Sequence, residues 1–401
     1  MQIIEKYSSY WAPLGGTLLF LLLGLLLWRS ASTAAERSEK SIDWVRQYRK
    51  GGFPFSAETL SAPPIRWVGV VLVFLIAACF AVLYQMNSSQ ILVHNFFSLL
   101  SSRYAITRMV LSALGGTAVF LLVRTMFGSP LTGFLGMLLF CTAPRPDCEQ
   151  NCLLAISLLF LVLYLRSGKA GFPAEFLYLA SVLFFVLCLA LWPGLIWLAP
   201  VLLVLHWYKL GWFTRHDELA VGWLLLSLLA ALAAWAIILG VCALLRVFLH
   251  AGFRFYPLRS VDSVQDYSAL VREFFLDMQQ SLFQKPMRKL LLGPMMAAPV
   301  LGLGFWGLIS AITQLRLRRS VPGGMVLVLT LAFAAAWLLT GMNILLLPLT
   351  LAACFLIRLA VAGKKTVLAL LICLLGIACH VAFALGVWYL PMNDILQYLM
   401  L

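Results

Sequence analysis

The chain has 401 residues, of which 63% are hydrophobic and 11% are charged, and its mean hydropathy is +0.98. This composition excludes an ordinary soluble globular protein and predicts an all-α polytopic membrane protein. The formal net charge of +14 comes from basic residues placed between apolar runs. They are read first as orientation signals, and no soluble basic domain is predicted that would bind nucleic acid.

The lengths of the apolar runs predict about twelve transmembrane helices. The runs 176–208 and 323–360 are each too long for one span, since a helix of the first length extends about 50 Å and a bilayer core is about 30 Å thick. We therefore expect breaks at Trp192-Pro193-Gly194 and at Gly341-Met342-Asn343. The other expected spans are 11–28, 66–84, 108–124, 129–144, 151–166, 219–245, 293–313 and 366–389.

Basic residues set the expected orientation, because Lys and Arg concentrate in cytoplasmic loops. Most of them fall on the inner side if the first span starts outside, so segment 29–65 is expected in the cytoplasm and loop 246–292 outside. Segment 29–65 also carries a short amphipathic stripe suited to the bilayer surface. A signal peptide is the alternative for the first span, since small residues follow it, but no basic region precedes it.

Loop 246–292 contains a helical pattern of its own. Its apolar residues recur at helical spacing from Val264 to Leu282, and Ser263-Val264-Gln265-Asp266 resembles a capping box. The pattern predicts an amphipathic helix at the outer membrane face. Such a helix would lie at the interface, cover an outer cavity as a lid, or do both.

Two outer loops, 85–107 and 143–151, are the segments where surface chemistry is expected. The second contains Pro144-Arg145-Pro146-Asp147-Cys148-Glu149-Gln150, a polar island in a very apolar chain. Asp147 also fits a helix N-cap, with Gln150 at the third helical position, so capping alone is an alternative role.

Motifs that would indicate other enzyme classes are absent: no P-loop, nucleophile elbow or dinucleotide fingerprint is present. The nine cysteines do not indicate a disulfide framework, since most lie inside apolar runs where Cys acts as a small hydrophobe. Cys148 and Cys152 are one helical turn apart, which leaves a metal site open, so a divalent metal ion is the only cofactor considered. The five histidines are scattered, and His94 and His250 are expected on the outer side as solvated or interfacial residues rather than ligands.

The arrangement resembles a known family over about 66–210. The Arg108-Met109-Val110-Leu111-Ser112-Ala113-Leu114-Gly115-Gly116 run is followed by a Gly128-Ser129-Pro130 turn, and Arg145-Pro146-Asp147 leads into the apolar run 158–165. This is similar to the N-terminal half of the GT-C superfamily of membrane glycosyltransferases, which includes protein-mannosyltransferase-like and aminoarabinose-transferase-like enzymes. The resemblance divides the chain into 1–65, a GT-C-like half 66–210, and a C-terminal half 211–401 that includes the outer loop.

The resemblance implies transfer of a sugar from a polyprenyl-phosphate donor at the outer face of the membrane. Such a transfer needs a carboxylate that deprotonates the acceptor hydroxyl and cations that bind the departing lipid phosphate. We expect Asp147 as the catalytic base, with Glu149 as the next candidate. The candidate cations are Arg103, Arg108, Arg145, Arg254 and Arg259, for which anchoring to lipid headgroups is the alternative role.

One departure from the family keeps other functions open. Members are expected to carry an acidic residue in the first outer loop, and segment 85–107 contains no Asp or Glu. A non-catalytic subunit or scaffold that binds a lipid-linked glycan or a membrane-protein partner is therefore the first alternative, and a lipid or glycan flippase is the second. In each case we expect an integral protein of a bacterial cytoplasmic membrane with its active face outward, in contact with membrane lipids.

Overall fold

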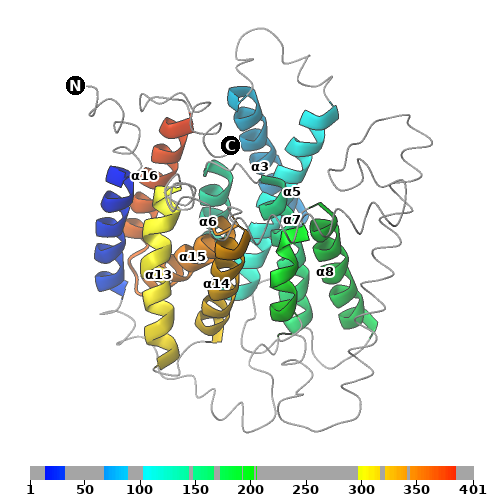
Figure 1. Ribbon diagram of the computed structural model, residues 1–401. Helices are drawn as coiled ribbons and strands as arrows, with labels where there is room; N and C mark the ends of the chain where they lie inside the picture. Colours follow the sequence, from blue (N-terminus) through cyan, green and yellow to red (C-terminus); the bar gives the residue numbers. More distant parts are fainter. Residues whose placement is uncertain are drawn as a thin grey trace, which may run out of the picture. The chain divides into compact units, whose positions relative to one another are not determined.

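The structure is a computed structural model, and its described residues are helical apart from short turns (Figure 1). The described residues are 14–31, 67–88, 103–143, 148–166, 172–191, 193–202, 205, 297–316, 321–340 and 344–384. Within these ranges no strand is present, so the described part of the chain is all-α, as its composition predicts.

Ten apolar α-helices fall on expected spans. Their bounds are Leu14–Ala31, α3 Trp67–Ser88, α5 Arg103–Phe127, α6 Pro130–Thr142, α7 Cys148–Arg166, α8 Phe172–Leu191, α13 Ala298–Arg316, α14 Val321–Thr340, α15 Leu346–Ala362 and α16 Thr366–Ala384.

Separate helices lie on either side of both expected breaks in the long apolar runs. Helix α8 ends at Leu191, and the 3₁₀-helix η1, Pro193–Leu198, follows it. In the other run α14 ends at Thr340 and α15 begins at Leu346. Pro193 stops the first helix because proline lacks the N–H that the helix needs and clashes with the preceding turn.

The expected outer loops were drawn too wide. Segment 85–107 was predicted as a loop, but α3 continues to Ser88 and α5 already begins at Arg103. Similarly, α7 begins at Cys148, so residues 148–151 of the second expected loop are helical. Short polar stretches at the ends of apolar helices can continue the helix, and hydropathy alone does not mark that point.

Two described helices, Leu14–Ala31 and Met109–Phe127 within α5, are long and apolar enough to cross a membrane. The apolar segments of the other eight described helices are 10–17 residues long. Large apolar side chains are exposed on several of them, among them Trp67, Leu22 and Leu371. The count of twelve spans stays a prediction. Span 219–245, loop 246–292 and most of segment 29–65 lie outside the described residues.

The helices form two compact units. The first contains Met1–Ala155, Pro286–Leu331 and Asn343–Leu401, and the second contains Ile156–Lys285 and Ala332–Met342. In the first unit α13 packs on α15, and α6 packs against α5, α15 and α16. Small residues allow these approaches: a Cβ on Gly307 of α13 would overlap the Ala352 carbonyl of α15.

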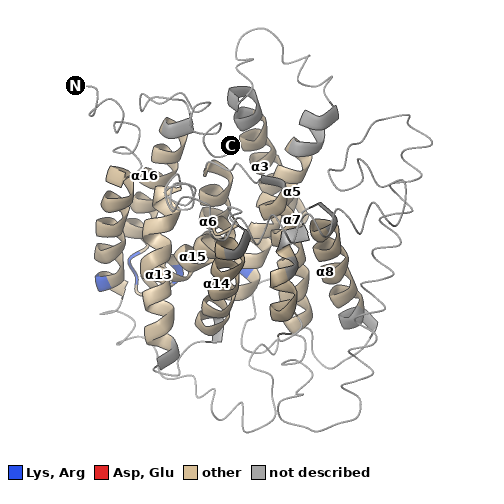
Figure 2. Ribbon diagram, viewed as in Figure 1, with Lys and Arg blue, Asp and Glu red and all other residues tan. Residues whose placement is uncertain are grey.

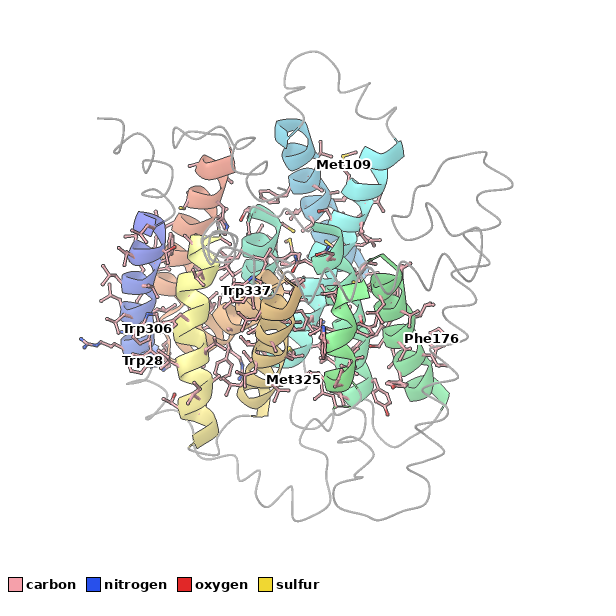
Figure 3. All side chains as sticks on the ribbon, in the orientation of Figure 1. Trp28, Met109, Phe176, Trp306, Met325 and Trp337 are labelled. Atoms are coloured by element: carbon pink, nitrogen blue, oxygen red, sulfur yellow. The ribbon has the colours of Figure 1, made fainter. Side chains whose placement is uncertain are left out.

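The Leu14–Ala31 helix is held on α13 by one face. Its buried residues follow a heptad-like spacing and are Thr17, Phe20, Gly24, Leu27 and Ala31. The indole N–H of Trp306 donates to the Leu21 carbonyl at 2.8 Å, and Trp28 stacks on Trp306 with ring centroids 5.1 Å apart (Figure 3). These contacts make the helix part of the first unit.

In the second unit, two serines join α7 to α8. Ser157 Oγ donates to the Ser181 carbonyl and Ser181 Oγ donates to the Ser157 carbonyl, each at 2.9 Å. Stacked Phe160 and Phe184 rings, 5.6 Å apart, lie on the same pair of helices. Both serines are 1% exposed, so this reciprocal pair satisfies two hydroxyls inside an apolar interface.

Candidate functional site

The structure describes some of the site residues that the sequence predicts, and others lie outside the described ranges. Arg103 is the first residue of α5, Arg108 lies just over one turn later, and Glu149 is in the first turn of α7. Helix α7 begins at Cys148, directly after the expected capping residue. Four residues lie outside the described ranges, and their roles stay predictions: Arg145, Asp147, Arg254 and Arg259.

The most distinctive element near these residues is α6, because it is short. Two residues separate it from the end of α5, and it has 13 residues, against 25 in α5. At 1.5 Å per residue, α6 extends about 20 Å and α5 about 37 Å. Helix α6 therefore ends about halfway along α5, and Figure 1 shows α5 continuing well beyond it.

Helix starts and stops explain this geometry. Gly128, with φ of 70°, ends α5 in the left-handed conformation that glycine adopts readily. Ser129 then caps α6, accepting from the Thr132 N–H at 3.3 Å, and Pro130 is its first residue. At its other end, α6 stops with an extended Ala143 whose N–H bonds the Leu139 carbonyl.

We call the end of α6, residues 141–143, and the start of α7, residues 148–152, the α6–α7 junction. Two adjacent glycines of α5 place it. Gly115 lies against Cys152 of α7, and Gly116 lies against Cys141 of α6, so closely that a Cβ at either glycine would overlap the cysteine. The middle of α5 thus fixes the position of both arms of the junction.

A hydrogen bond joins the junction to α16. Thr142 Oγ1 lies 3.1 Å from His380 Nδ1 and also donates to the Leu138 carbonyl at 2.8 Å. Thr142 is fully buried, and His380 is 1% exposed. The contact couples residues 238 positions apart and places a titratable ring at the end of α6.

The first turn of α7 adds buried amides to the same junction. Gln150 is 4% exposed and Asn151 is 1% exposed. The sequence suggested an outer loop ending at residue 151, yet these residues are helical and buried. The junction therefore contains a buried hydroxyl that contacts an imidazole of α16, together with two buried amides.

Five basic residues of the first unit lie at the other end of its helices, away from the end of α6. Arg29, Arg124 and Arg358 lie near the C-terminal ends of their helices, and Lys364 and Lys365 form the turn between α15 and α16. Figure 2 shows the basic segments at a similar level. The α6–α7 junction lies away from them, because Arg124 is in the last turn of α5, just before α6 begins, and Lys365 directly precedes α16.

Sequence reasoning missed Thr142 and His380. His380 was one of five scattered histidines, and Thr142 was counted within an apolar span. The available signal was position: an ionisable residue inside an apolar helix is a functional hypothesis by default. Among the described residues, no group of three His, Cys, Asp or Glu is placed to hold a metal ion.

No family model, curated protein or solved structure matches this chain.

Proposed function

We propose that the protein is an integral membrane glycosyltransferase of a bacterial cytoplasmic membrane. It transfers a sugar from a polyprenyl-phosphate donor to a hydroxyl acceptor at the outer face, and the α6–α7 junction is the reaction site. The proposal includes a polytopic fold of about twelve spans.

The observation that carries the proposal is the depth of the junction. If the basic ends of the helices mark the inner boundary, as the distribution of Lys and Arg in membrane proteins suggests, then α6 ends about 10 Å short of the outer boundary of a core about 30 Å thick. Non-helical backbone at that depth is tolerated only where protein buries it or where it lines a water-filled cavity. A recessed polar junction suits a lipid-linked sugar, whose reacting carbon lies just beyond a lipid phosphate.

The length of α5 supports the same orientation. Arg108 is 19 residues from Phe127, which corresponds to about 28 Å of helix, and Arg103 lies about 7 Å further out. The positions of both arginines in α5 would thus lie at the outer headgroup level, where a guanidinium can pair with phosphate oxygens. Arg145, Arg254 and Arg259 are proposed for the same role, as ligands of the departing lipid phosphate.

The transfer assay uses purified protein in proteoliposomes that contain a bacterial membrane extract as the source of acceptors. Each of several radiolabelled polyprenyl-phosphate hexoses is added, and release of polyprenyl phosphate together with labelled product is measured. We expect release with at least one donor, lost in the Arg103→Gln, Arg108→Gln double variant. Donors that all stay intact, with folded protein present, would contradict the proposal.

A non-catalytic subunit that binds a lipid-linked glycan is the second candidate. It is favoured by the scarcity of carboxylates: the described helices contain two acidic residues, Glu149 and Glu175, and segment 85–107 contains none. Donor binding to the proteoliposomes without any turnover would select this candidate. A flippase, the third, would move the labelled lipid between leaflets without cleaving it.

A further inference from the structure

Glycosyl transfer to a hydroxyl requires a group that accepts a proton. The acceptor oxygen attacks the anomeric carbon, the bond from that carbon to the phosphate oxygen breaks, and polyprenyl phosphate leaves with the electron pair. The proton of the acceptor hydroxyl must pass to a base as the new bond forms. The first outer loop, where the family resemblance places a carboxylate, offers none.

His380 is suited to this role by the hydrogen bonds around Thr142. A hydroxyl has one proton, and the short contact of Thr142 Oγ1 with the Leu138 carbonyl, 2.8 Å, uses it. The contact with His380 Nδ1 is then satisfied by an Nδ1–H that donates to Oγ1. In a neutral imidazole this assignment leaves the lone pair on Nε2, so that nitrogen is the proton acceptor.

The placement of His380 agrees with that role. It lies 14 residues after the start of α16, which corresponds to about 21 Å along the helix from the basic turn at Lys364 and Lys365. That height equals the height of the end of α6, about 20 Å above its own start. The ring is therefore at the depth of the α6–α7 junction, away from the basic ends of the helices.

A merely structural contact does not need a titratable ring. Ser157 and Ser181 join two apolar helices with hydroxyls alone, at 2.9 Å in both directions. A histidine in an apolar helix is costly by comparison, and ionisable residues at such positions commonly serve proton transfer.

We infer that His380 Nε2 accepts the proton of the acceptor hydroxyl, with Thr142 holding the ring in the required tautomer. This inference rests on the proposed function and names its base. Asp147 then keeps only the capping role that the sequence predicts for it, and the proton taken by His380 is returned to water after the product leaves.

The test compares His380→Gln and His380→Ala with the wild type in the proteoliposome transfer assay. We expect both variants to lower kcat about a hundredfold or more, while KM for the donor changes less than threefold. Added imidazole should restore at least a tenth of the lost rate to His380→Ala, and none to His380→Gln, whose side chain fills the space. A structural role would not produce this rescue.

Other outcomes overturn the inference separately from the proposed function. A wild type without transfer activity contradicts the function itself. A wild type that transfers sugar, beside folded variants with near-normal kcat, contradicts the role of His380. If both variants lose folded protein, His380→Asn is measured in their place, because its amide keeps a donor near the Nδ1 position. A folded Asn variant at the wild-type rate also overturns the inference.

Discussion

The contact between α7 and α8 differs in its chemistry from the contact between α6 and α16. Each joins two apolar helices by a buried hydroxyl. Ser157 and Ser181 exchange two equivalent bonds of 2.9 Å. Thr142 instead meets the His380 ring at 3.1 Å, at the end of a helix rather than along it.

The difference shows how a structural polar contact can be told from a functional one in an apolar bundle. The serine pair is symmetric, and neither hydroxyl ionises near neutral pH. The threonine contact includes an imidazole, whose ring nitrogens can each donate or accept a proton. It also lies where α6 ends, about halfway along α5.

The largest expected effect comes from moving the junction itself. A Cβ on Gly115 would lie 2.9 Å from the Cys152 Cα, so Gly115→Ala must push α7 away from α5. We expect a loss of about 1–3 kcal/mol in an SDS unfolding titration, together with reduced transfer. The matched control is Gly69→Ala in α3, where a Cβ has no atom within 4 Å. Equal stability of the two variants would show that the junction is not tightly placed.

Thr142→Val tests the tautomer directly, because valine keeps the shape and removes the hydroxyl. His380 Nδ1 then loses its acceptor, and we expect about a tenfold lower kcat, the cost of one such hydrogen bond. Thr142→Ser keeps the hydroxyl and should stay close to the wild type. If Val and Ser variants transfer at the same rate, the ring is not oriented by this contact.

The positions of the helices were predictable, whereas the contact at the junction was not. Run lengths in the apolar stretches placed ten helices, and Pro193 placed a break, because both signals are local. Thr142 and His380 lie 238 residues apart in helices that are apolar on every side. Such helices lack an amphipathic pattern, so the sequence does not indicate which face of a helix packs against which neighbouring helix. Asp147 was visible in the sequence because its polar neighbours stand out.

Asp147 is the alternative candidate for the base, and substitutions can distinguish its role as a helix cap from a role as a proton acceptor. Asparagine caps a helix about as well as aspartate but cannot take a proton at neutral pH. We expect Asp147→Asn to keep stability and transfer, and Asp147→Ala to lose roughly 1 kcal/mol of stability. A hundredfold loss of transfer in the Asn variant, beside an active His380→Gln, would make Asp147 the base.

The smallest effect is expected at the serine pair. Ser157→Ala removes one of the two bonds, and hydrogen bonds between membrane helices average about 0.6 kcal/mol. Stability should fall by about that amount, while the transfer rate stays unchanged. A clear loss of transfer in folded Ser157→Ala protein would remove the distinction drawn between the two contacts.

The tautomer of His380 is the most direct test of the account. Nitrogen NMR of histidine-labelled protein in nanodiscs reads the protonation of both ring nitrogens, and His380→Gln identifies the signals of this ring. We predict a proton on Nδ1, held toward Thr142, and an unprotonated Nε2 at neutral pH. A proton on Nε2 with a bare Nδ1 would contradict the account, because the nitrogen assigned to accept the proton would already carry one.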